Sequence, residues 1–241
     1  FRLGARALEE PEIGVAASDR GDLVHNVLAR IWLDIREQGA LARLSPDQRL
    51  STIRTAIATE TAVAKRDTQG AMRHLLDIES EWLEARIAEL LAADLERPQF
   101  TVEGVEQKLS ISIGGLTLAL RIDRVDRLDD GSLAVIDYKT GADAEPDAWL
   151  GERPRLPQLP LYAEALGMDQ VSALAFGRVR TGDTGYCGFA RDSTLFSGLK
   201  SPAARGWPRE YASWQELLEA KRLIVRGQVA LVEELERMLA K

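Results

Sequence analysis

Two hairpin turns determine how three strands of this chain pair. "SIGGLTL" places Gly114-Gly115 between two alternating apolar runs, which is the signal of a two-residue hairpin loop. "RLDDGSL" carries Asp129-Asp130-Gly131, which suits a three-residue loop with glycine at its left-handed position. Because a turn sets the register of the strands on either side of it, the stretch 100–140 is predicted to be a three-stranded meander of defined register.

This register brings three carboxylates together. The first turn places Glu106 opposite Asp123, and the second places Asp123 opposite Asp137. Positions two apart share a face of a strand, so three basic side chains are expected beside the acids: Lys108, Arg121 and Lys139. The opposite face is apolar and is expected to be the core side, with Leu109, Ile111, Leu118, Leu120, Ile122, Ile136 and Tyr138.

Three facing carboxylates need a compensating charge. Like charges opposite one another destabilise a sheet and raise one another's pKa values. A divalent cation relieves this cost, and Mg²⁺ prefers oxygen ligands, including those of a phosphate. Lys139 would then stabilise an anionic transition state, or orient and deprotonate a water on the metal. The pattern points to metal-assisted hydrolysis of a phosphate ester; the alternative is a set of ordinary cross-strand ion pairs on a solvated face.

Helical periodicity flanks the meander on both sides. A helix is predicted from about Asp19 to Gly39, and a second helical region begins at Ser45-Pro46 and runs with breaks to Leu95, before Pro98. After the meander the predicted elements are a helix within 146–167, a β-like stretch at about 171–191 and a long C-terminal helix from about Ser213. This order predicts one mixed α/β domain with helical additions.

Composition narrows the class of protein. The single Cys187 excludes a disulfide framework and a multi-cysteine metal or iron–sulfur site, and it fits a reducing, cytosolic setting. No apolar run is long enough for a membrane span. The net charge of −7 argues against a generally basic nucleic-acid coat, although it leaves room for a local basic groove. Because the chain starts at Phe1 without an initiator Met, we expect it to be a fragment of a longer protein.

Four segments together resemble a known family. "LRIDRVDRLDDGSLAVIDYKTG", which contributes two of them, resembles the core signature of the PD-(D/E)XK nuclease superfamily in its RecB-like branch. "GDLVHNVL" resembles the upstream glycine–histidine helix motif of that branch, and "QLPLYAEAL" its downstream Q-x-x-x-Y motif. The matches occur in the family's order between about residues 21 and 167. The resemblance implies an α/β fold with a mixed β-sheet core of the restriction-endonuclease type, flanked by helices and extended by an N-terminal helical region.

The same resemblance implies roles for individual residues. The implied metal ligands are His25, Glu106, Asp123 and Asp137. The implied catalytic residues are Asp123, Asp137, Lys139, Gln158 and Tyr162. Gln158 and Tyr162 are four residues apart, so they share one face of a helix, and they match the family's pair near the DNA backbone. Leu120 departs from the family pattern, since glycine usually precedes R-I-D, but the catalytic acids are intact.

The resemblance also implies a domain layout. Residues 1–241 are expected to form a single RecB-like nuclease domain in three parts. These parts are a mainly helical region with the histidine motif (1–97), a catalytic sheet core with an embedded helix (98–192) and a C-terminal helical cover (193–241).

The implied activity is Mg²⁺-dependent hydrolysis of DNA phosphodiester bonds, with Mn²⁺ as a substitute and no iron–sulfur cluster. An exonuclease of DNA repair or recombination in the bacterial cytosol is expected, with DNA and a helicase or helicase-like domain as partners and no membrane. Two other functions stay open from the residues themselves. One is a catalytically inactive DNA-binding or scaffolding module with a nuclease fold, and the other is a metal-dependent phosphohydrolase of small nucleotides.

Overall fold

A mixed six-stranded sheet forms the centre of the molecule. The computed structural model describes residues 17–65, 71–113, 116–142, 144–152 and 154–239. Within them the strands lie in sequence order: β1 (Phe100–Ile113), β2 (Leu116–Leu128), β3 (Leu133–Lys139), β4 (Val171–Arg178), β5 (Gly185–Ala190) and β6 (Leu199–Lys200). The β3–β4 and β5–β6 pairs are parallel and the others antiparallel, so the prediction of a mixed sheet is confirmed.

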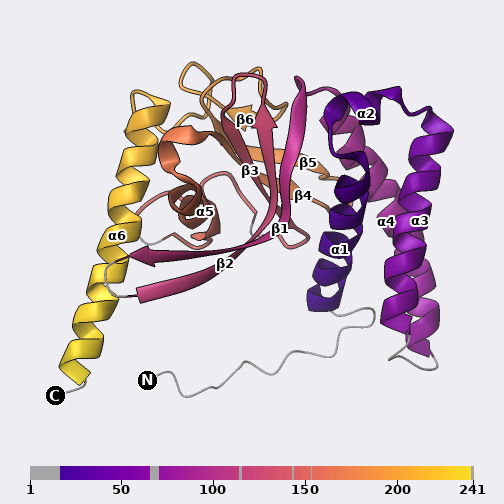
Figure 1. Ribbon diagram of the computed structural model, residues 1–241, viewed down its shortest axis with the longest axis horizontal. Coiled ribbons are helices and arrows are strands. Elements are labelled where there is room, and N and C mark those ends of the chain that lie inside the picture. Colours follow the sequence, from indigo (N-terminus) through magenta and orange to yellow (C-terminus); the bar gives the residue numbers. More distant parts are fainter. Residues whose placement is uncertain (1–16, 66–70, 114–115, 143, 153, 240–241) are drawn as a thin grey trace.

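Helices cover both faces of this sheet (Figure 1). On one face lie α1 (Ala17–Ile35), α2 (Gln38–Arg43), α3 (Pro46–Ala64) and α4 (Ala71–Leu95). On the other lie α5 (Gln158–Leu166) and α6 (Trp214–Leu239), with the short 3₁₀-helix η2 (Met168–Gln170) after α5. Within the described part of the chain, no helix combines the length and apolar character that a membrane crossing requires.

The predicted register of the two hairpins is confirmed by the strand pairing. In β1 and β2, Gln107 pairs with Ile122 and Val105 with Arg124, which places Glu106 and Asp123 between these pairs. The Gly114-Gly115 turn itself lies outside the described residues. In the second hairpin, Leu128 N donates to the Ser132 carbonyl oxygen at 2.8 Å and Val125 pairs with Val135, as the three-residue loop predicts.

The β2–β3 ladder stops at the acids. Its last pair is Arg124 with Ile136, so the predicted partners Asp123 and Asp137 lie immediately beyond it. There the Asp123 carboxylate accepts a hydrogen bond from the Tyr138 N–H at 2.6 Å. A side chain therefore takes the place of a backbone carbonyl at the end of the ladder.

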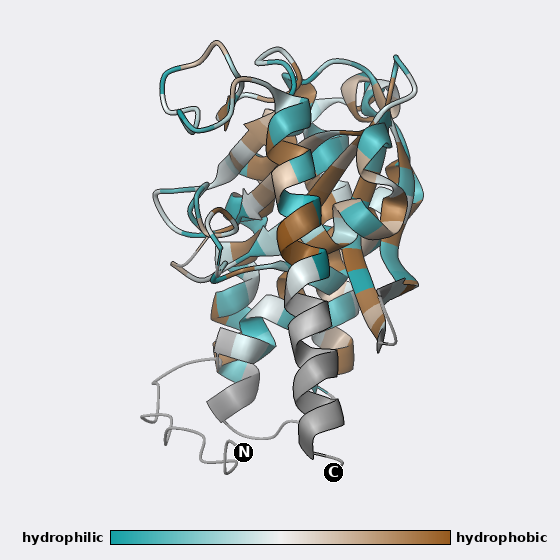
Figure 2. Ribbon diagram, turned by 90° about the vertical axis from the view of Figure 1, so that its left-hand side faces the viewer, coloured by the Kyte–Doolittle hydropathy of each residue, from teal (hydrophilic) through white to brown (hydrophobic). Residues whose placement is uncertain are grey.

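The meander does not have a single core side, as expected from its apolar face, because both faces of β3 are buried. Ile136 and Tyr138 pack against α1–α4, whereas Val135 packs with the α5–α6 side. The residues predicted to share one core side therefore lie on two faces: Ile136 and Tyr138 on the α1–α4 side, and Ile122 on the α5–α6 side. In Figure 2 the strands are largely hydrophobic, whereas the loops around them are mostly hydrophilic. A strand covered on both sides explains the unbroken apolar run of β3.

The boundaries of the N-terminal helices show one confirmed prediction and one error. Ser45 caps α3, with Gln48 completing a capping box and Pro46 in the first turn, as the sequence indicates. The first helix does not run to Gly39. It ends at Ile35 because Arg36 adopts a left-handed conformation (φ 65°), and the Arg36 carbonyl then accepts a hydrogen bond from Val102 N at 2.7 Å.

A buried network of two aspartates and two arginines joins the helices to the sheet. Arg124 of β2 lies 3.0 Å from Asp94 of α4 and 2.6 Å from Asp126, and Arg97 lies 2.7 Å from each of these acids. The Arg124 guanidinium also sits 3.8 Å from the centre of the Trp32 ring on α1. Burial alone would raise the pKa of Asp94, but the charges of Arg124 and Arg97 outweigh it and lower that pKa.

Replacing Asp94 by alanine is expected to lower the free energy of unfolding by about 3–5 kcal/mol, because two buried arginines would lose a counter-charge. Urea denaturation monitored by circular dichroism measures this. Glu103→Ala is the matched control, since it removes a carboxylate from an exposed ion pair with Arg127, and we expect a loss below about 1 kcal/mol. Equal losses in the two variants would contradict a structural role for the network.

Candidate metal and catalytic site

Three potential ligands from three elements meet at the end of the β2–β3 ladder. His25 of α1, Glu106 of β1 and Asp123 of β2 each offer one ligand atom, and these atoms lie within 4.8 Å of one another. His25 Nδ1 is 3.4 Å from Asp123 Oδ1 and 3.9 Å from Glu106 Oε1. One imidazole nitrogen and two carboxylate oxygens form a donor set that fits a divalent cation.

The peptide groups of Tyr138 orient two of these three side chains. Its N–H donates to Asp123 Oδ2 at 2.6 Å, and its carbonyl oxygen lies 3.0 Å from His25 Nε2. Because a carbonyl oxygen only accepts, Nε2 carries the proton, and the other nitrogen of a neutral ring would direct a lone pair toward the acids. Hydrogen bonding of this kind is typical of metal-ligating histidines.

Glu106 is held from two sides in a strained conformation. It has a positive φ of 50°, which costs a residue other than glycine about 1–3 kcal/mol and is often found at functional sites. Its Oε2 forms an ion pair with Arg121 Nε, while Oε1 faces His25. Burial and the charge of Asp123 raise the pKa of Glu106, so this carboxylate lies in a site with excess negative charge.

Asp137 and Lys139 adjoin the three ligands on β3. Asp137 is 2% exposed, and its Oδ2 lies 2.5 Å from Lys139 Nζ. Burial, and next the charge of Asp123, raise the pKa of Asp137 to about 6, although Lys139 acts in the opposite direction. Asp137 does not belong to the group of His25, Glu106 and Asp123, whose ligand atoms lie within 4.8 Å of one another. The structure therefore brings together three of the four predicted metal ligands and places the fourth beside them.

Tyr162 approaches the acids from α5, the helix that begins at Gln158. Tyr162 is 7% exposed, and burial together with the charges of Asp137 and Asp123 raises the pKa of its hydroxyl. Gln158 lies at the start of the helix, and its buried side-chain oxygen has no hydrogen-bond partner among the described residues. A buried amide oxygen without a partner suits a site that is completed by a ligand.

One contribution to the site is not predicted from the sequence. Tyr138 was predicted to be a packing residue, and its side chain is indeed buried, but its main chain also orients His25 and Asp123. Main-chain hydrogen bonds leave no sequence signal, so no pattern could have revealed this role. Arg121 was placed near the acids, and the structure adds its ion pair with Glu106.

Comparison with known proteins places these residues in a family. The family model described as "PD-(D/E)XK nuclease superfamily" matches residues 1–238. Three relatives, all subunits of an "ATP-dependent helicase/deoxyribonuclease" from Streptococcus agalactiae serotypes Ia, V and III, are each 39% identical over 74 residues. The match covers 30% of this chain and 7% of each relative, so the chain corresponds to a small part of those proteins.

The protonation of His25 can be tested in the metal-free protein. Burial opposes the charged imidazolium, but the hydrogen bond and charge of Asp123 outweigh it, so the pKa of His25 lies above its ordinary value. The protonated ring therefore stabilises the fold below the unfolded-state pKa, and this contribution is lost as pH rises through the folded-state value.

An NMR titration of the two histidines measures this shift. Asp123→Asn is expected to lower the pKa of His25, whereas the resonance of the exposed His74 on α4 serves as an internal reference. An unchanged titration of His25 in the variant would contradict the contact with Asp123.

Proposed function

Because the chain belongs to the PD-(D/E)XK nuclease superfamily, we propose that it is a Mg²⁺-dependent nuclease that hydrolyses DNA phosphodiester bonds. The observation that carries the proposal is the meeting of His25, Glu106 and Asp123 around one point, with the Asp137–Lys139 ion pair beside it. This arrangement offers oxygen and nitrogen ligands that can bind a cation, and beside them an ammonium group that can contact a phosphate.

The residues present fit a hard divalent cation. His25, Glu106 and Asp123 would hold it, with Asp137 as a further carboxylate on the adjoining strand. The raised pKa values of Glu106 and Asp137 support this assignment, since they report crowding of negative charge that a cation relieves. A bound Mg²⁺ supplies positive charge for the phosphate oxygens and lowers the pKa of water.

Lys139 is proposed to act on the attacking water and on the phosphate. The Lys139 side chain is 23% exposed and its ammonium contacts Asp137, so the residue lies between the buried acid and the solvent from which substrate arrives. There it would orient the water and offset the negative charge that develops on the phosphate oxygens. Asp137 holds the ammonium in this position. The two groups are 2.5 Å apart, and the Asp137 side chain is buried, so solvent weakens their contact little.

Gln158 and Tyr162 are proposed to position the substrate from α5. The side-chain oxygen of Gln158 is buried and has no hydrogen-bond partner among the described residues. Burial and the neighbouring acids keep the Tyr162 phenol protonated, so its hydroxyl would act as a hydrogen-bond donor to a phosphate oxygen. Both residues would therefore orient a phosphodiester without changing charge.

The biological setting is also a proposal. We infer an exonuclease of DNA repair or recombination that works with a helicase or helicase-like domain in the bacterial cytosol. The support is the name of the relatives, which combines a helicase and a deoxyribonuclease, together with the RecB-like motifs of the chain. The RecB-like domain layout, with the sheet core at 98–192, is proposed on the same basis.

Single substitutions in the site should separate catalysis from folding. Asp137→Asn and Lys139→Ala are each expected to reduce DNA cleavage in Mg²⁺ by at least about 100-fold, because they remove a charge that acts directly on the reaction. EDTA should stop cleavage by the wild type, and Mg²⁺ or Mn²⁺ should restore it. Arg43→Ala, a charge change at the exposed end of α2, is the matched control and should keep wild-type activity.

Full activity in either site variant would overturn the mechanism. Binding of DNA without cleavage by the wild type in Mn²⁺ would instead favour the inactive binding module. Faster turnover of free nucleotides than of oligonucleotides would favour the small-nucleotide phosphohydrolase.

End-labelled DNA distinguishes the mode of cleavage. If the protein is an exonuclease, digestion of a 5′-labelled and a 3′-labelled strand should release short labelled products from one end first. Circular DNA of the same sequence should resist under the same conditions. Cleavage of the circle at a comparable rate would contradict the exonuclease assignment and leave the nuclease assignment in place.

A further inference from the structure

The β1–β2 hairpin continues beyond the rest of the sheet as a two-stranded arm. The β2–β3 ladder ends at Arg124, whereas β1 and β2 remain paired as far as Ile113 and Leu116. Here "the arm" means residues 107–113 and 116–122. Figure 1 shows it reaching from the sheet toward α6.

One face of the arm is packed and the other is exposed. Leu109 and Leu120 pack with the α5–α6 side of the core, and Ile111 and Leu118 pack with Leu161 and Val225. The opposite face, which we call the arm strip, is exposed along its whole length and consists of Lys108, Ser110, Ser112, Thr117, Ala119 and Arg121. Within the described part of the chain, this sheet face has no covering element.

The charge of the arm strip differs from that of the whole chain. The strip carries two cations and no acid, although the net charge of the chain is −7. Many exposed cations elsewhere are neutralised by acids, as Arg43 is by Glu37 and Arg127 by Glu103. Within the strip, Arg121 is likewise paired with Glu106, whereas Lys108 forms no ion pair with an acid among the described residues.

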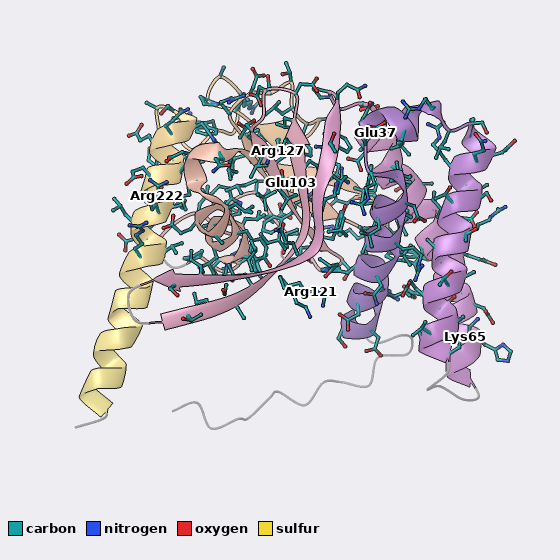
Figure 3. The ribbon with its side chains drawn as sticks, in the orientation of Figure 1. Glu37, Lys65, Glu103, Arg121, Arg127 and Arg222 are labelled. Atoms are coloured by element: carbon teal, nitrogen blue, oxygen red, sulfur yellow. The ribbon has the colours of Figure 1, made fainter. Side chains whose placement is uncertain are left out.

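The strip leads directly into the metal and catalytic site. Lys108 pairs across the hairpin with Arg121, which lies at the base of the arm and is 57% exposed (Figure 3). Arg121 in turn contacts Glu106, one of the three clustered ligands. The remaining side chains of the strip are small, and Ser112 and Thr117 lie within hydrogen-bond distance of one another at 3.2 Å. A chain of phosphates could therefore approach the backbone of the arm closely.

We propose that the arm strip binds the sugar–phosphate backbone of the DNA strand whose phosphate lies in the catalytic site. This inference rests on the proposed nuclease function and adds the surface that holds the substrate. The Lys108 ammonium contacts one phosphate, and the hydroxyls of Ser110, Ser112 and Thr117 donate to neighbouring ones. At about 3.4 Å per residue, the six steps from Glu106 to Ser112 span about 20 Å, the axial length of about six nucleotides of one duplex strand.

The salt dependence of DNA binding tests this proposal. All variants carry Lys139→Ala, which is expected to prevent cleavage. Their binding to fluorescent single-stranded and duplex oligonucleotides is measured in the presence of Mg²⁺. Adding Lys108→Ala is expected to weaken binding about threefold to fivefold at low salt. It should also reduce the slope of log K against log salt by about 0.9 on duplex or about 0.7 on single strands, the value for one lost phosphate contact. The DNA form with the larger change identifies the substrate that the arm takes.

Two further variants separate a contact from a general charge effect. Lys108→Arg should retain both the affinity and the slope, because it preserves the cation. Arg43→Ala, made in the same background, removes one positive charge at α2 and should change neither quantity.

A second pair of variants tests the hydroxyl-bearing part of the strip. Ser110→Asp places a carboxylate between the proposed phosphates and should weaken binding about tenfold or more. Thr101→Asp introduces the same charge at an exposed position of the same strand outside the arm, and it should have little effect. Circular dichroism confirms that each variant is folded.

The failures of the two proposals are distinguishable. If the wild type cleaves DNA while Lys108→Ala and Ser110→Asp bind like their controls, the arm strip is not the DNA surface and the nuclease assignment stands. If the wild type neither cleaves nor binds DNA, both proposals are overturned.

Discussion

The buried ion-pair network of Asp94, Arg97, Arg124 and Asp126 is the constraint on which the rest of the structure depends. Its charges balance, and each guanidinium contacts both carboxylates, which is the condition under which buried charges are tolerated. The network ties the end of α4 to β2, and the Arg124 guanidinium lies over Trp32 of α1. The helical layer is therefore held against the sheet at a defined position.

That position determines the site. Arg124 is adjacent to Asp123 in the chain, so the residue that anchors the helices and the residue that approaches the proposed metal belong to the same strand segment. With α1 fixed over this segment, His25 reaches the carbonyl of Tyr138, which is 113 residues away in the chain. The two peptide groups of Tyr138 on β3 then hold both side chains: the carbonyl oxygen contacts His25, and the N–H donates to Asp123. Displacement of α1 would therefore disturb the contact of His25 with Tyr138 and, through Tyr138, the position of Asp123.

The end of the β2–β3 ladder is the second requirement of the site. If the two strands had stayed paired, the Tyr138 N–H would have been directed to a backbone carbonyl. Because the ladder stops after Arg124 and Ile136, that N–H is available to the Asp123 side chain. Beyond this point β1 and β2 continue alone as the arm, which exposes one face of a two-stranded ribbon beside the proposed catalytic residues.

Local sequence determined much of this protein. Turn chemistry around Asp129-Asp130-Gly131 specifies the register that brings Asp123 and Asp137 together, and the alternation along β1 and β2 keeps Glu106 and Asp123 on one face. A one-residue slip would turn every side chain of a strand to the other face. Ser45 and Pro46 likewise specify the start of α3. The left-handed conformation of Arg36 was not predictable in this way, since the residue type disfavours it and a contact with β1 stabilises it.

Only the tertiary structure decided where the ladder ends, which face of β3 each helix layer covers and how His25 reaches the acids. These features depend on contacts between residues distant in the chain, such as Asp94 with Arg124 and His25 with Tyr138. Hydrophobic periodicity reports which side of an element is buried, but not which partner buries it. The acids were therefore predictable as a row on a sheet, and their enclosure between two layers of helices was not.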